Sequence, residues 1–369
     1  MKTVRILQII DKIDKNSGVW SAVNNYYKHI DSSEFIFDFM VNQEVEENLK
    51  KEIEQRGSKI YVMPELKGKN MLQYKKELKS FFSTHKEYRI VHGHVPNASA
   101  FYLREAKKAG VPIRILHSHN SRGADGIAKK IRNYILNHMG VSAANVYLAC
   151  SAPAAQYLFG TTDERKVRIV RNAIDLKKFA YNKEVRENLR KKYHVEDKFV
   201  IGHIGRFAEQ KNHRFLIEIA KELKDIRRDF SFVLVGDGPL RLEIEQMVKK
   251  MGLSEHFIFV GSVDNPQDYY QMMDLFAMPS LYEGLPVVGV EAQAAGLPCL
   301  FSDTITREIL LTKQAKQLSI QKADEWAEEL AGVVKQRNLE NVELIEQHGF
   351  SIEKEAKKLE DIYLKLIGK

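Results

Sequence analysis

Short apolar runs alternate with amphipathic stretches along most of the chain. In the first half the expected strands are Val4–Ile10, Phe35–Val41, Ile60–Met63, Ile90–Gly93, Ile113–Leu116, Val146–Ala149 and Val167–Val170. Helical periodicity falls between them, near Val19–Ile30, Glu44–Arg56, Leu72–His85, Ala98–Ala109, Ile127–Gly140 and Ala152–Tyr157. Strands separated by helices of this length predict a mostly parallel, doubly wound sheet.

A second alternating set begins at Val200. It comprises Val200–Ile204, Leu216–Ile226, Phe230–Val235, Leu240–Met251, Ile258–Val260, Pro266–Met272, Leu275–Met278, Val287–Ala295 and Cys299–Phe301, and from Trp326 onward the pattern is mostly helical. The segment from Asn172 to Tyr193 is polar and charged, and we place the linker there. The prediction is an α/β protein with two Rossmann-like domains, residues 1–180 and 181–351, facing each other across a cleft.

Bulk composition agrees with two soluble domains. A chain of 369 residues with 44% apolar content has enough material for two cores. The two cysteines, Cys150 and Cys299, lie far apart in apolar contexts, so the sequence implies no disulfide framework and favours a reducing, cytoplasmic compartment. The N-terminal apolar run is interrupted by Arg5 and Gln8 and is too short for a signal peptide. No run approaches the roughly 18 apolar residues that span a bilayer.

The net charge of +8 is unevenly distributed. Residues 1–180 contain 30 Lys and Arg against 18 Asp and Glu, whereas residues 181–369 contain 27 against 31. A first half this basic could face anionic lipid at the inner membrane surface, a phosphate-bearing acceptor or nucleic acid, or could simply be solvated. Nucleic acid is disfavoured as a partner because the chain has no RNP, helix-turn-helix or zinc-finger signature.

The stretch Leu275–Ser302 carries the clearest chemical signal. It reads as a buried strand, a turn, a helix over about Val287–Ala295 and a second strand, with Gly296 suited to the left-handed position after the helix. The first N–H groups of a helix have no partners within it, and together with the helix dipole they form a site for a phosphate.

Two carboxylates and two cations are expected near that helix start. Glu283 precedes the helix, and Glu291 lies about one turn inside it. Carboxylates repel phosphate but accept hydrogen bonds from sugar hydroxyls, so this combination points to a nucleotide-sugar. Arg206 and Lys211 follow the strand Val200–Ile204, where ligands bind in such sheets, and two cations there suit a diphosphate. The alternative is that Arg206 and Lys211 are ordinary surface cations with no ligand.

Glycines mark two other strand exits. Gly236-Asp237-Gly238-Pro239 follows a strand but fails the spacing of a dinucleotide fingerprint. It is either a bare turn or a place where the backbone approaches a nucleotide. Gly18, after the first strand, could likewise let the backbone approach a phosphate.

Histidines concentrate at two strand ends of the first half, in VHGHVPN and ILHSHNS. The pairs His92 and His94, and His117 and His119, lack the carboxylate or cysteine partners of a typical zinc site, so we expect no metal. A histidine that donates to a sugar hydroxyl or phosphate is the favoured interpretation, with His119 the strongest candidate. Histidines satisfied by backbone partners are the alternative.

The helical stretch Ile127–Met139 places apolar residues on one side and Lys129, Lys130 and Arg132 elsewhere. This pattern fits an interfacial membrane helix. It fits an ordinary helix with its apolar side toward the core at least as well, and we expect the latter.

The motifs together resemble the retaining glycosyltransferases of family 4, which have the two-domain GT-B fold. The resemblance rests on Gly205-Arg206 with Lys211, on Gly236-Asp237-Gly238-Pro239, and above all on the Glu283-x7-Glu291 element. It covers most of the chain. The first half, with HSHN and Asn172-Ala173-Ile174-Asp175, looks like the branch that makes bacterial capsule or exopolysaccharide.

The resemblance implies roles by position. Arg206 and Lys211 would bind the donor diphosphate, Glu291 the ribose, and Glu283 the hydroxyls of the donor sugar. Together with the residue patterns this gives a donor-binding set of Gly18, Gly205, Arg206, Lys211, Gly236, Gly238, Glu283, Gly284, Leu285, Val287 and Glu291. The acceptor set is His94, His117, His119 and Asn120, and the catalytic set is His119, Arg206, Lys211 and Glu283. The final helix, within residues 352–369, would cross back to the first domain.

The sequence departs from the family pattern at two points. Ser17-Gly18 stands where the family has a glycine pair, and Asn212 follows Lys211 where glycine is usual.

The expected activity is metal-independent, cofactor-free transfer of a sugar, with retention, from a nucleotide donor such as a UDP-sugar. The acceptor would be a glycan or a lipid-linked saccharide. A nucleotide-sugar epimerase on the same fold and a non-catalytic partner subunit are the alternatives.

Overall fold

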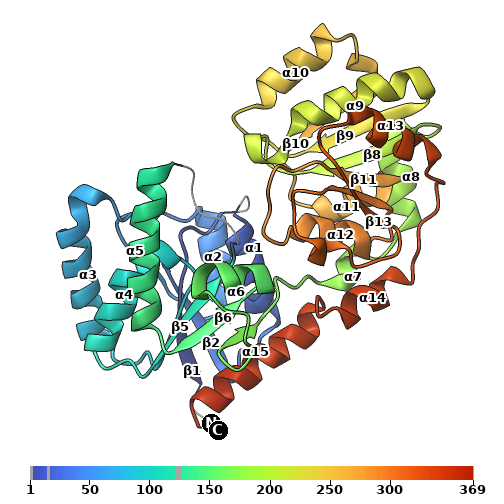
Figure 1. Ribbon diagram of the computed structural model, residues 1–369. Coiled ribbons are helices and arrows are strands. Elements are labelled where there is room, and N and C mark those ends of the chain that lie inside the picture. The colour runs from blue at the N-terminus through green and yellow to red at the C-terminus, as the bar shows by residue number, and fades with distance from the viewer. Residues whose placement is uncertain (1–2, 15–16, 121–125, 369) are drawn as a thin grey trace. The chain divides into compact units, whose positions relative to one another are not determined.

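The computed structural model describes residues 3–14, 17–120 and 126–368. Internal contacts divide the chain into two compact units, Met1–Ala173 with Ile352–Lys369, and Ile174–Ser351 (Figure 1). The division falls before residue 180 because Ile174 already pairs with Ser351 and donates its N–H to the carbonyl of Phe350 at 2.9 Å.

The first unit is built on a parallel sheet, seven-stranded among the described residues, in the order β3-β2-β1-β4-β5-β6-β7. Its strands are β1 Val4–Ile9, β2 Phe35–Val41, β3 Ile60–Val62, β4 Ile90–Gly93, β5 Ile113–Ser118, β6 Val146–Ala149 and β7 Val167–Ile169. Its helices are α1 Gly18–His29, α2 Glu47–Gln55, α3 Met71–Thr84, α4 Pro96–Lys108, α5 Ile127–Ala143, α6 Ala152–Phe159 and α15 Ile352–Leu366, with a 3-10 turn at Gly68–Asn70.

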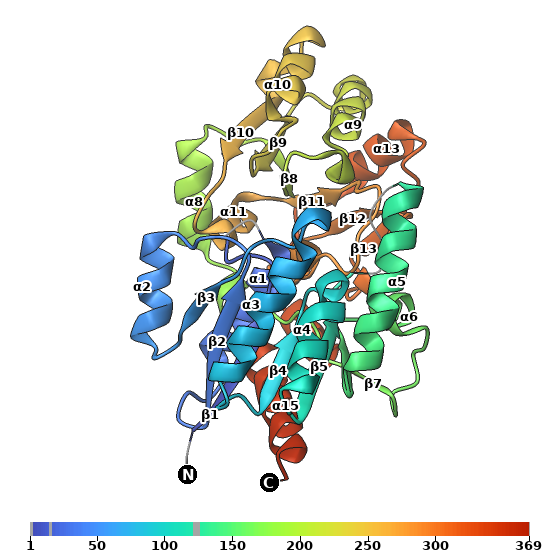
Figure 2. The same ribbon diagram turned by 90° about the vertical axis from the view of Figure 1, so that its left-hand side faces the viewer.

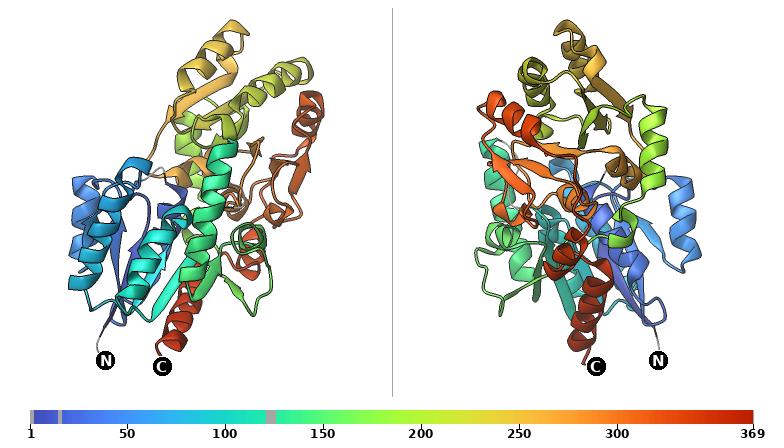
Figure 3. Two further views of the ribbon diagram at one scale, coloured as in Figure 1. Left: turned by 60° about the vertical axis from the view of Figure 1, so that its left-hand side comes forward. Right: turned by 90° about the vertical axis from the view of Figure 1, so that its right-hand side faces the viewer.

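Each face of this sheet has its own core. On one face α1, α2 and α15 pack on the strands, with Trp20, Tyr27 and Tyr363 among the buried side chains. On the other face α3, α4, α5 and α6 pack on the strands, with Tyr74 and Tyr102 buried. Figure 2 shows α3, α4 and α5 lying side by side, and Figure 3 shows α15 along the same unit.

The second unit has a parallel sheet in the order β10-β9-β8-β11-β12-β13, six-stranded as far as the described residues show. Its strands are β8 Phe199–Ile204, β9 Phe230–Val235, β10 Phe257–Gly261, β11 Leu275–Met278, β12 Cys299–Ser302 and β13 Ala315–Leu318. Its helices are α7 Leu176–Phe179, α8 Lys183–Lys192, α9 His213–Ile226, α10 Arg241–Lys250, α11 Pro266–Met272, α12 Val287–Ala294, α13 Ala323–Gly332 and α14 Asn341–Gln347, with 3-10 turns at Glu209–Lys211 (η2), Ser254–His256 and Arg307–Ile309.

The segment interpreted from sequence as a linker is ordered in this unit. It forms α7 and α8, and α8 is held by Arg190, whose buried guanidinium donates to Asp274 at 3.0 Å. Charged residues dominate the sequence of α8, which is why the segment resembles a linker, but Asp274 pairs with two of its cations, Arg186 and Arg190.

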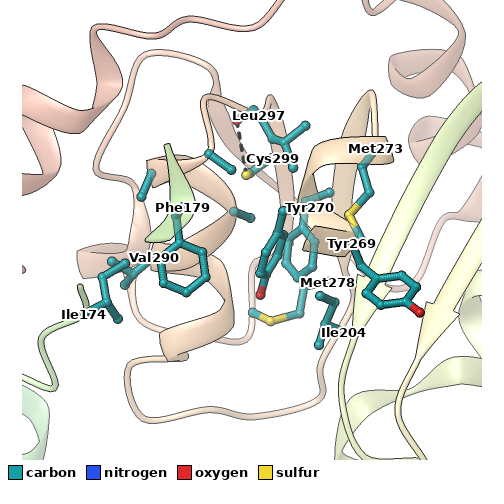
Figure 4. Packing of buried hydrophobic residues seen from close by; sticks show 14 of the residues in the cluster. Ile174, Phe179, Ile204, Tyr269, Tyr270, Met273, Met278, Val290, Leu297 and Cys299 are labelled. Atoms are coloured by element: carbon teal, nitrogen blue, oxygen red, sulfur yellow. Dashed lines mark hydrogen bonds between the residues drawn. The ribbon is translucent and has the colours of Figure 1, made fainter. Parts of the chain in front are cut away.

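The core beneath α12 positions the segment with the clearest sequence signal. Val290 on the helix packs with Phe179 from α7 and Tyr270 from α11 (Figure 4). Gly289 lies so close to Phe301 that a Cβ atom would come within 2.9 Å of its ring. Helix α12 is therefore fixed on the sheet along its buried side, which holds its first turn at the end of β11.

Candidate functional site

The loop after β8 carries the two predicted cations. Gly205 donates its N–H to the carbonyl of Val235 on the adjacent strand at 2.9 Å, which continues the sheet past the strand end. Arg206 is exposed, and η2 then brings Lys211 back toward the sheet, where its side-chain carbons lie 3.3 Å from the position of a Cβ at Gly205. Two of the predicted donor residues, Gly205 and Lys211, are thus in contact.

Asn212 explains one of the departures from the family pattern. Its φ of 54° and ψ of 47° place it in the left-handed region, where it ends η2 and begins α9. Glycine adopts this conformation without cost, and asparagine is among the few other residues that do so routinely. The departure therefore leaves the loop geometry intact.

Lys211 and Glu283 form a direct ion pair, with Nζ 2.6 Å from Oε1 and both side chains mostly buried. Gln210 donates from Nε2 to the other carboxylate oxygen of Glu283 at 3.1 Å and to the carbonyl of Tyr282 at 3.0 Å. The N–H of Leu281 donates to the carbonyl of Gln210 at 2.8 Å. These bonds join η2 to the loop that leads into α12, although the two segments lie some 70 residues apart.

The two glycines after β9 are required by the neighbouring loop. Gly236 has φ of 135°, and a Cβ there would lie 2.1 Å from the carbonyl oxygen of Gly205. Gly238 has φ of 159°, and its Cβ would lie 2.5 Å from the carbonyl oxygen of Phe207. These two glycines therefore allow the loop after β8 to approach the backbone closely. A donor-binding role for either glycine stays a prediction.

Helix α12 begins at Val287, and among the described residues no side chain caps its N-terminus. Gly289 and Val290 both direct their N–H groups to the carbonyl of Pro286. Leu285 is buried just before the helix, whereas Gly284 is partly exposed. Past the other end, Gly296 has φ of 76°, which confirms the predicted left-handed position. The bonds to Pro286 use the N–H groups of Gly289 and Val290, so an anion at this helix start would meet the N–H groups of Val287 and Val288, the first two residues of α12.

Glu291 lies in the second turn of α12, where Tyr270 donates its hydroxyl hydrogen to Oε2 at 2.7 Å. Burial raises the pKa of Glu291 to about 7, and the hydrogen bond from Tyr270 opposes this shift. The carboxyl group therefore titrates near neutral pH, and its charge is sensitive to any ligand that replaces water around it.

Sequence reasoning missed a buried pair of histidines beneath the β8 exit loop. His203 donates from Nδ1 to the carbonyl of Ala277 at 2.9 Å, and burial lowers its pKa to about 4. His213 stacks on Phe207 with ring centroids 4.1 Å apart, and burial lowers its pKa to about 2. Both rings are neutral at pH 7, so Lys211 above them meets no neighbouring imidazolium charge.

In the first unit, the predicted histidines join in a hydrogen-bonded chain. His94 bonds through Nδ1 to Nε2 of His119 at 2.8 Å, and through Nε2 to Oε1 of Gln8 at 2.9 Å. His92 bonds to Tyr363 of α15 at 2.7 Å and to Nδ1 of His117 at 3.2 Å. The strand register explains the cluster, because β1, β4 and β5 are adjacent and parallel.

Only the outer end of this chain reaches the surface among the predicted acceptor residues. His94 and His117 are buried, His119 is partly buried and bonds through Nδ1 to Asn172 at 3.0 Å, and Asn120 is exposed. The cavity between the rings has room for about one water molecule. Of the predicted acceptor residues, His119 and Asn120 are therefore the accessible ones, and His94 contacts His119 from the buried side. An acceptor-binding role for these residues stays a prediction.

Burial lowers the pKa of all four histidines, with that of His119 falling to about 4. The cluster is therefore neutral at pH 7. Nitrogen atoms of His92, His94 and His117 lie within 4.8 Å of one another, close enough for a shared metal ion. In this structure, however, the rings of His92 and His94 are stacked and their nitrogens bond to neighbouring side chains.

Gln8, Asn172 and Tyr363 were not predicted as site residues. Gln8 had a signal, because it is a polar residue inside an apolar strand. Tyr363 had no such signal, because an aromatic residue on the apolar side of a helix normally indicates a place in the hydrophobic core.

Gly18 begins α1 after Ser17, which caps the helix by accepting from the N–H of Trp20 at 3.3 Å. A Cβ at Gly18 would meet open space, so the described fold does not itself require glycine there.

Comparison with known proteins identifies the family. Residues 40–178 match the model described as Glycosyltransferase Family 4, and residues 185–348 match Glycosyl transferases group 1. A putative glycosyltransferase, EpsF of Bacillus subtilis strain 168, is 34% identical over 310 residues, which cover 83% of this chain and 80% of EpsF. The chain belongs to glycosyltransferase family 4.

Other relatives of this glycosyltransferase agree. The Escherichia coli UDP-Gal:alpha-D-GlcNAc-diphosphoundecaprenol alpha-1,3-galactosyltransferase is 27% identical over 316 residues, which cover 79% of this chain and 80% of that enzyme. The crystal structure of Anabaena HepE in complex with UDP and glucose aligns with a TM-score of 0.81, at 15% identity, over 98% of this chain and 100% of HepE. The fold is GT-B, as the sequence resemblance implied.

Proposed function

We propose that this glycosyltransferase transfers a sugar from a UDP-sugar to a hydroxyl group of a lipid-linked saccharide, with retention at the anomeric carbon. The reaction would serve bacterial capsule or exopolysaccharide synthesis at the cytoplasmic face of the cell membrane. The second unit would bind the donor and the basic first unit the acceptor.

The observation that carries the donor proposal is the Lys211–Glu283 pair, held by Gln210 beside the loop that leads into α12. A diphosphate needs cations and N–H donors, which Lys211 and the first turn of α12 supply. A sugar needs hydrogen-bond acceptors, and the carboxylate of Glu283 is already oriented by two donors. Glu291, one turn into the helix, offers a second acceptor suited to a ribose.

In the proposed reaction, the bond between the anomeric carbon and the phosphate oxygen breaks while a bond to the acceptor oxygen forms on the same face. The acceptor proton passes to the departing phosphate oxygen. Negative charge grows on that phosphate, so the Lys211 ammonium and the N–H groups of α12 would stabilise the transition state more than the ground state. No protein group need serve as the base.

The acceptor proposal rests on the first unit and on relatives. The E. coli relative is named for a diphosphoundecaprenol-linked acceptor, and HepE was crystallised with UDP and glucose. His119 and Asn120 sit at the carboxyl end of β5, where their neutral side chains can bond sugar hydroxyls. A lipid-linked acceptor also requires the enzyme to meet the anionic inner surface of the membrane.

A transfer assay tests this function. The protein would be incubated with UDP-galactose, UDP-glucose and the corresponding N-acetylhexosamine donors, together with polyprenyl-diphosphate-linked N-acetylglucosamine. The proposal expects UDP release that depends on the acceptor, and a product whose NMR coupling at the anomeric carbon matches that of the donor. An inverted product would refute retention. Formation of a 2-epimer without acceptor, or no turnover with any donor, would refute the transfer itself.

A further inference from the structure

Helix α5 presents its apolar side to solvent, contrary to the expectation from sequence. Ile131, Tyr134 and Ile135 are 57%, 75% and 52% exposed. They lie three and four residues apart, so they form one continuous stripe, which we call the α5 ridge. The expectation of a core-facing apolar side was wrong because periodicity shows which residues share a side of a helix but not which side packs inward.

Small residues explain why α5 packs with its other side inward. Gly140 follows Ile131 by about two and a half turns, so it lies on the opposite side of the helix. A Cβ at Gly140 would lie 1.6 Å from the hydroxyl oxygen of Ser99 on α4. Ala143 is also buried against this helix layer. The close α4–α5 contact therefore fixes the α5 ridge outward.

Cations flank the α5 ridge. Lys130 and Arg132 fall about 100° on either side of Ile131 in a helix of 3.6 residues per turn, and both are exposed. Helix α5 contains no acidic residue. Long basic side chains beside an apolar stripe can extend to lipid headgroups while the stripe enters the acyl boundary. Among the described residues, no helix has the length and apolar character to cross a membrane, so contact through this helix would be peripheral.

We propose that the α5 ridge, with Lys130 and Arg132, is the surface by which the enzyme binds an anionic lipid bilayer. Three large apolar side chains exposed together on one helix are unusual for a surface that meets only water. The flanking positive charge selects an anionic bilayer over a neutral one, and the excess of Lys and Arg in residues 1–180 acts in the same direction. This inference rests on the proposed lipid-linked acceptor only for its biological purpose, since bilayer binding is measured without acceptor or donor.

The test is co-flotation of the full-length protein with vesicles of phosphatidylcholine alone or of phosphatidylcholine mixed with anionic phosphatidylglycerol. The wild type is expected to float with the anionic vesicles and to be released as salt is raised. Ile131→Gln with Ile135→Gln should lower the partition coefficient at least about tenfold. Lys130→Gln with Arg132→Gln should lower it about fivefold per cation. All four side chains are exposed, so the melting temperature should not change.

A matched control lies on the second unit. Helix α10 carries an exposed Leu242, at 67%, and exposed Lys249 and Lys250. The triple change Leu242→Gln, Lys249→Gln and Lys250→Gln should leave binding intact. Absence of binding to anionic vesicles, equal binding to neutral vesicles, or an equal loss in the α10 variant would each overturn the assignment. Bilayer binding combined with transfer only to soluble acceptors would refute the acceptor proposal and leave the surface standing.

Discussion

The carboxyl ends of the two sheets carry polar side chains of opposite kinds. In the second unit the side chains are charged and paired, as Lys211 and Glu283 show at 2.6 Å. In the first unit they are neutral, because burial holds the pKa values of the four histidines below 6.5.

The same fold can therefore present two chemically distinct edges. A charged edge beside a helix start suits a ligand that is itself charged and whose charge changes during reaction. A neutral edge of hydrogen-bonding rings suits hydroxyl groups, which gain little from a full charge nearby. This difference supports placing the donor in the second unit and the acceptor in the first.

The largest effect on activity is expected from removing Lys211 or Glu283, the ion pair at the charged edge of the second unit. Lys211→Ala should lower turnover by roughly 10²- to 10³-fold, the range measured when one group that stabilises transition-state charge is removed. Glu283→Ala should lower turnover by a similar factor, because it removes both the acceptor for the donor-sugar hydroxyls and the partner that positions Lys211. Because the two side chains touch, the double variant should lose less than the product of the single losses. Steady-state kinetics provide the measurement, with Lys224→Ala, an exposed lysine on α9, as the control. Near-normal rates in both single variants would remove the charged edge from the mechanism.

A pH titration of nucleotide binding sharpens the comparison within the second unit. With a pKa of about 7, Glu291 gains its charge between pH 6 and pH 8. If the carboxylate accepts a ribose hydroxyl, UDP affinity should rise roughly tenfold over this range. Glu291→Gln should remove that rise, while the titration of UDP itself stays common to both proteins. The same slope in the variant as in the wild type would exclude Glu291 from the binding site.

Stability should respond to pH with opposite signs at the two edges. His119 has a folded pKa of about 4 against 6.5 unfolded, so the unfolded state binds protons more tightly and stability is lost as pH falls from 6.5 to 4. Glu291 has a raised pKa in the folded state, so the folded state binds the proton more tightly. Its contribution to the free energy of unfolding is therefore lost as pH rises from 4.5 to 7.

The histidine contribution can be isolated by urea unfolding. His119→Gln removes the titrating group, so its loss of unfolding free energy between pH 7.5 and pH 5 should be smaller than that of the wild type by about 2 kcal/mol. The control is His138→Gln, which removes an exposed imidazole on α5. If the unfolding free energies of His119→Gln and the wild type depended equally on pH, His119 would not be held neutral in the folded protein.

The smallest effect concerns the loop beneath Lys211. Asn212→Gly should change stability by less than about 0.5 kcal/mol, because relief of the left-handed conformation is offset by greater freedom in the unfolded chain. Asn212→Ala should lose about 1 kcal/mol, since alanine does not readily adopt φ of 54°. Thermal unfolding of the two variants measures the difference. A more stable alanine variant would contradict the assigned backbone geometry.

Sequence reasoning predicted the two sheets, and the convergence of the loops that carry Lys211 and Glu283, because both depend on the order of elements along the chain. Parallel strands end at one edge, so residues just after Ile204, Val235 and Met278 had to converge there. The start of α12 and the left-handed Gly296 follow from local signals as well. The strand β13 was missed because its sequence, AKQL, is short and half polar, as suits the edge of a sheet.

What sequence reasoning did not find depends on tertiary contact. The bond from Tyr270 to Glu291 and that from His94 to Gln8 join side chains from different elements, and neither leaves a pattern in the chain. Which side of α5 faces outward also depends on tertiary contact, because the close approach of Gly140 to Ser99 on α4 fixes the packed side. Hydrophobic periodicity cannot show which side of a helix packs inward when the packed side consists of small residues.

Calorimetric titration of UDP tests the central claim, that the charged edge of the second unit is a nucleotide-sugar site, most directly. We predict that the wild type binds UDP with a measurable Kd and that Glu291→Ala weakens binding at least about tenfold. Glu328→Ala, which changes an exposed glutamate on α13, should bind as the wild type does. No binding at millimolar UDP, or the same affinity in Glu291→Ala as in the wild type, would contradict the account.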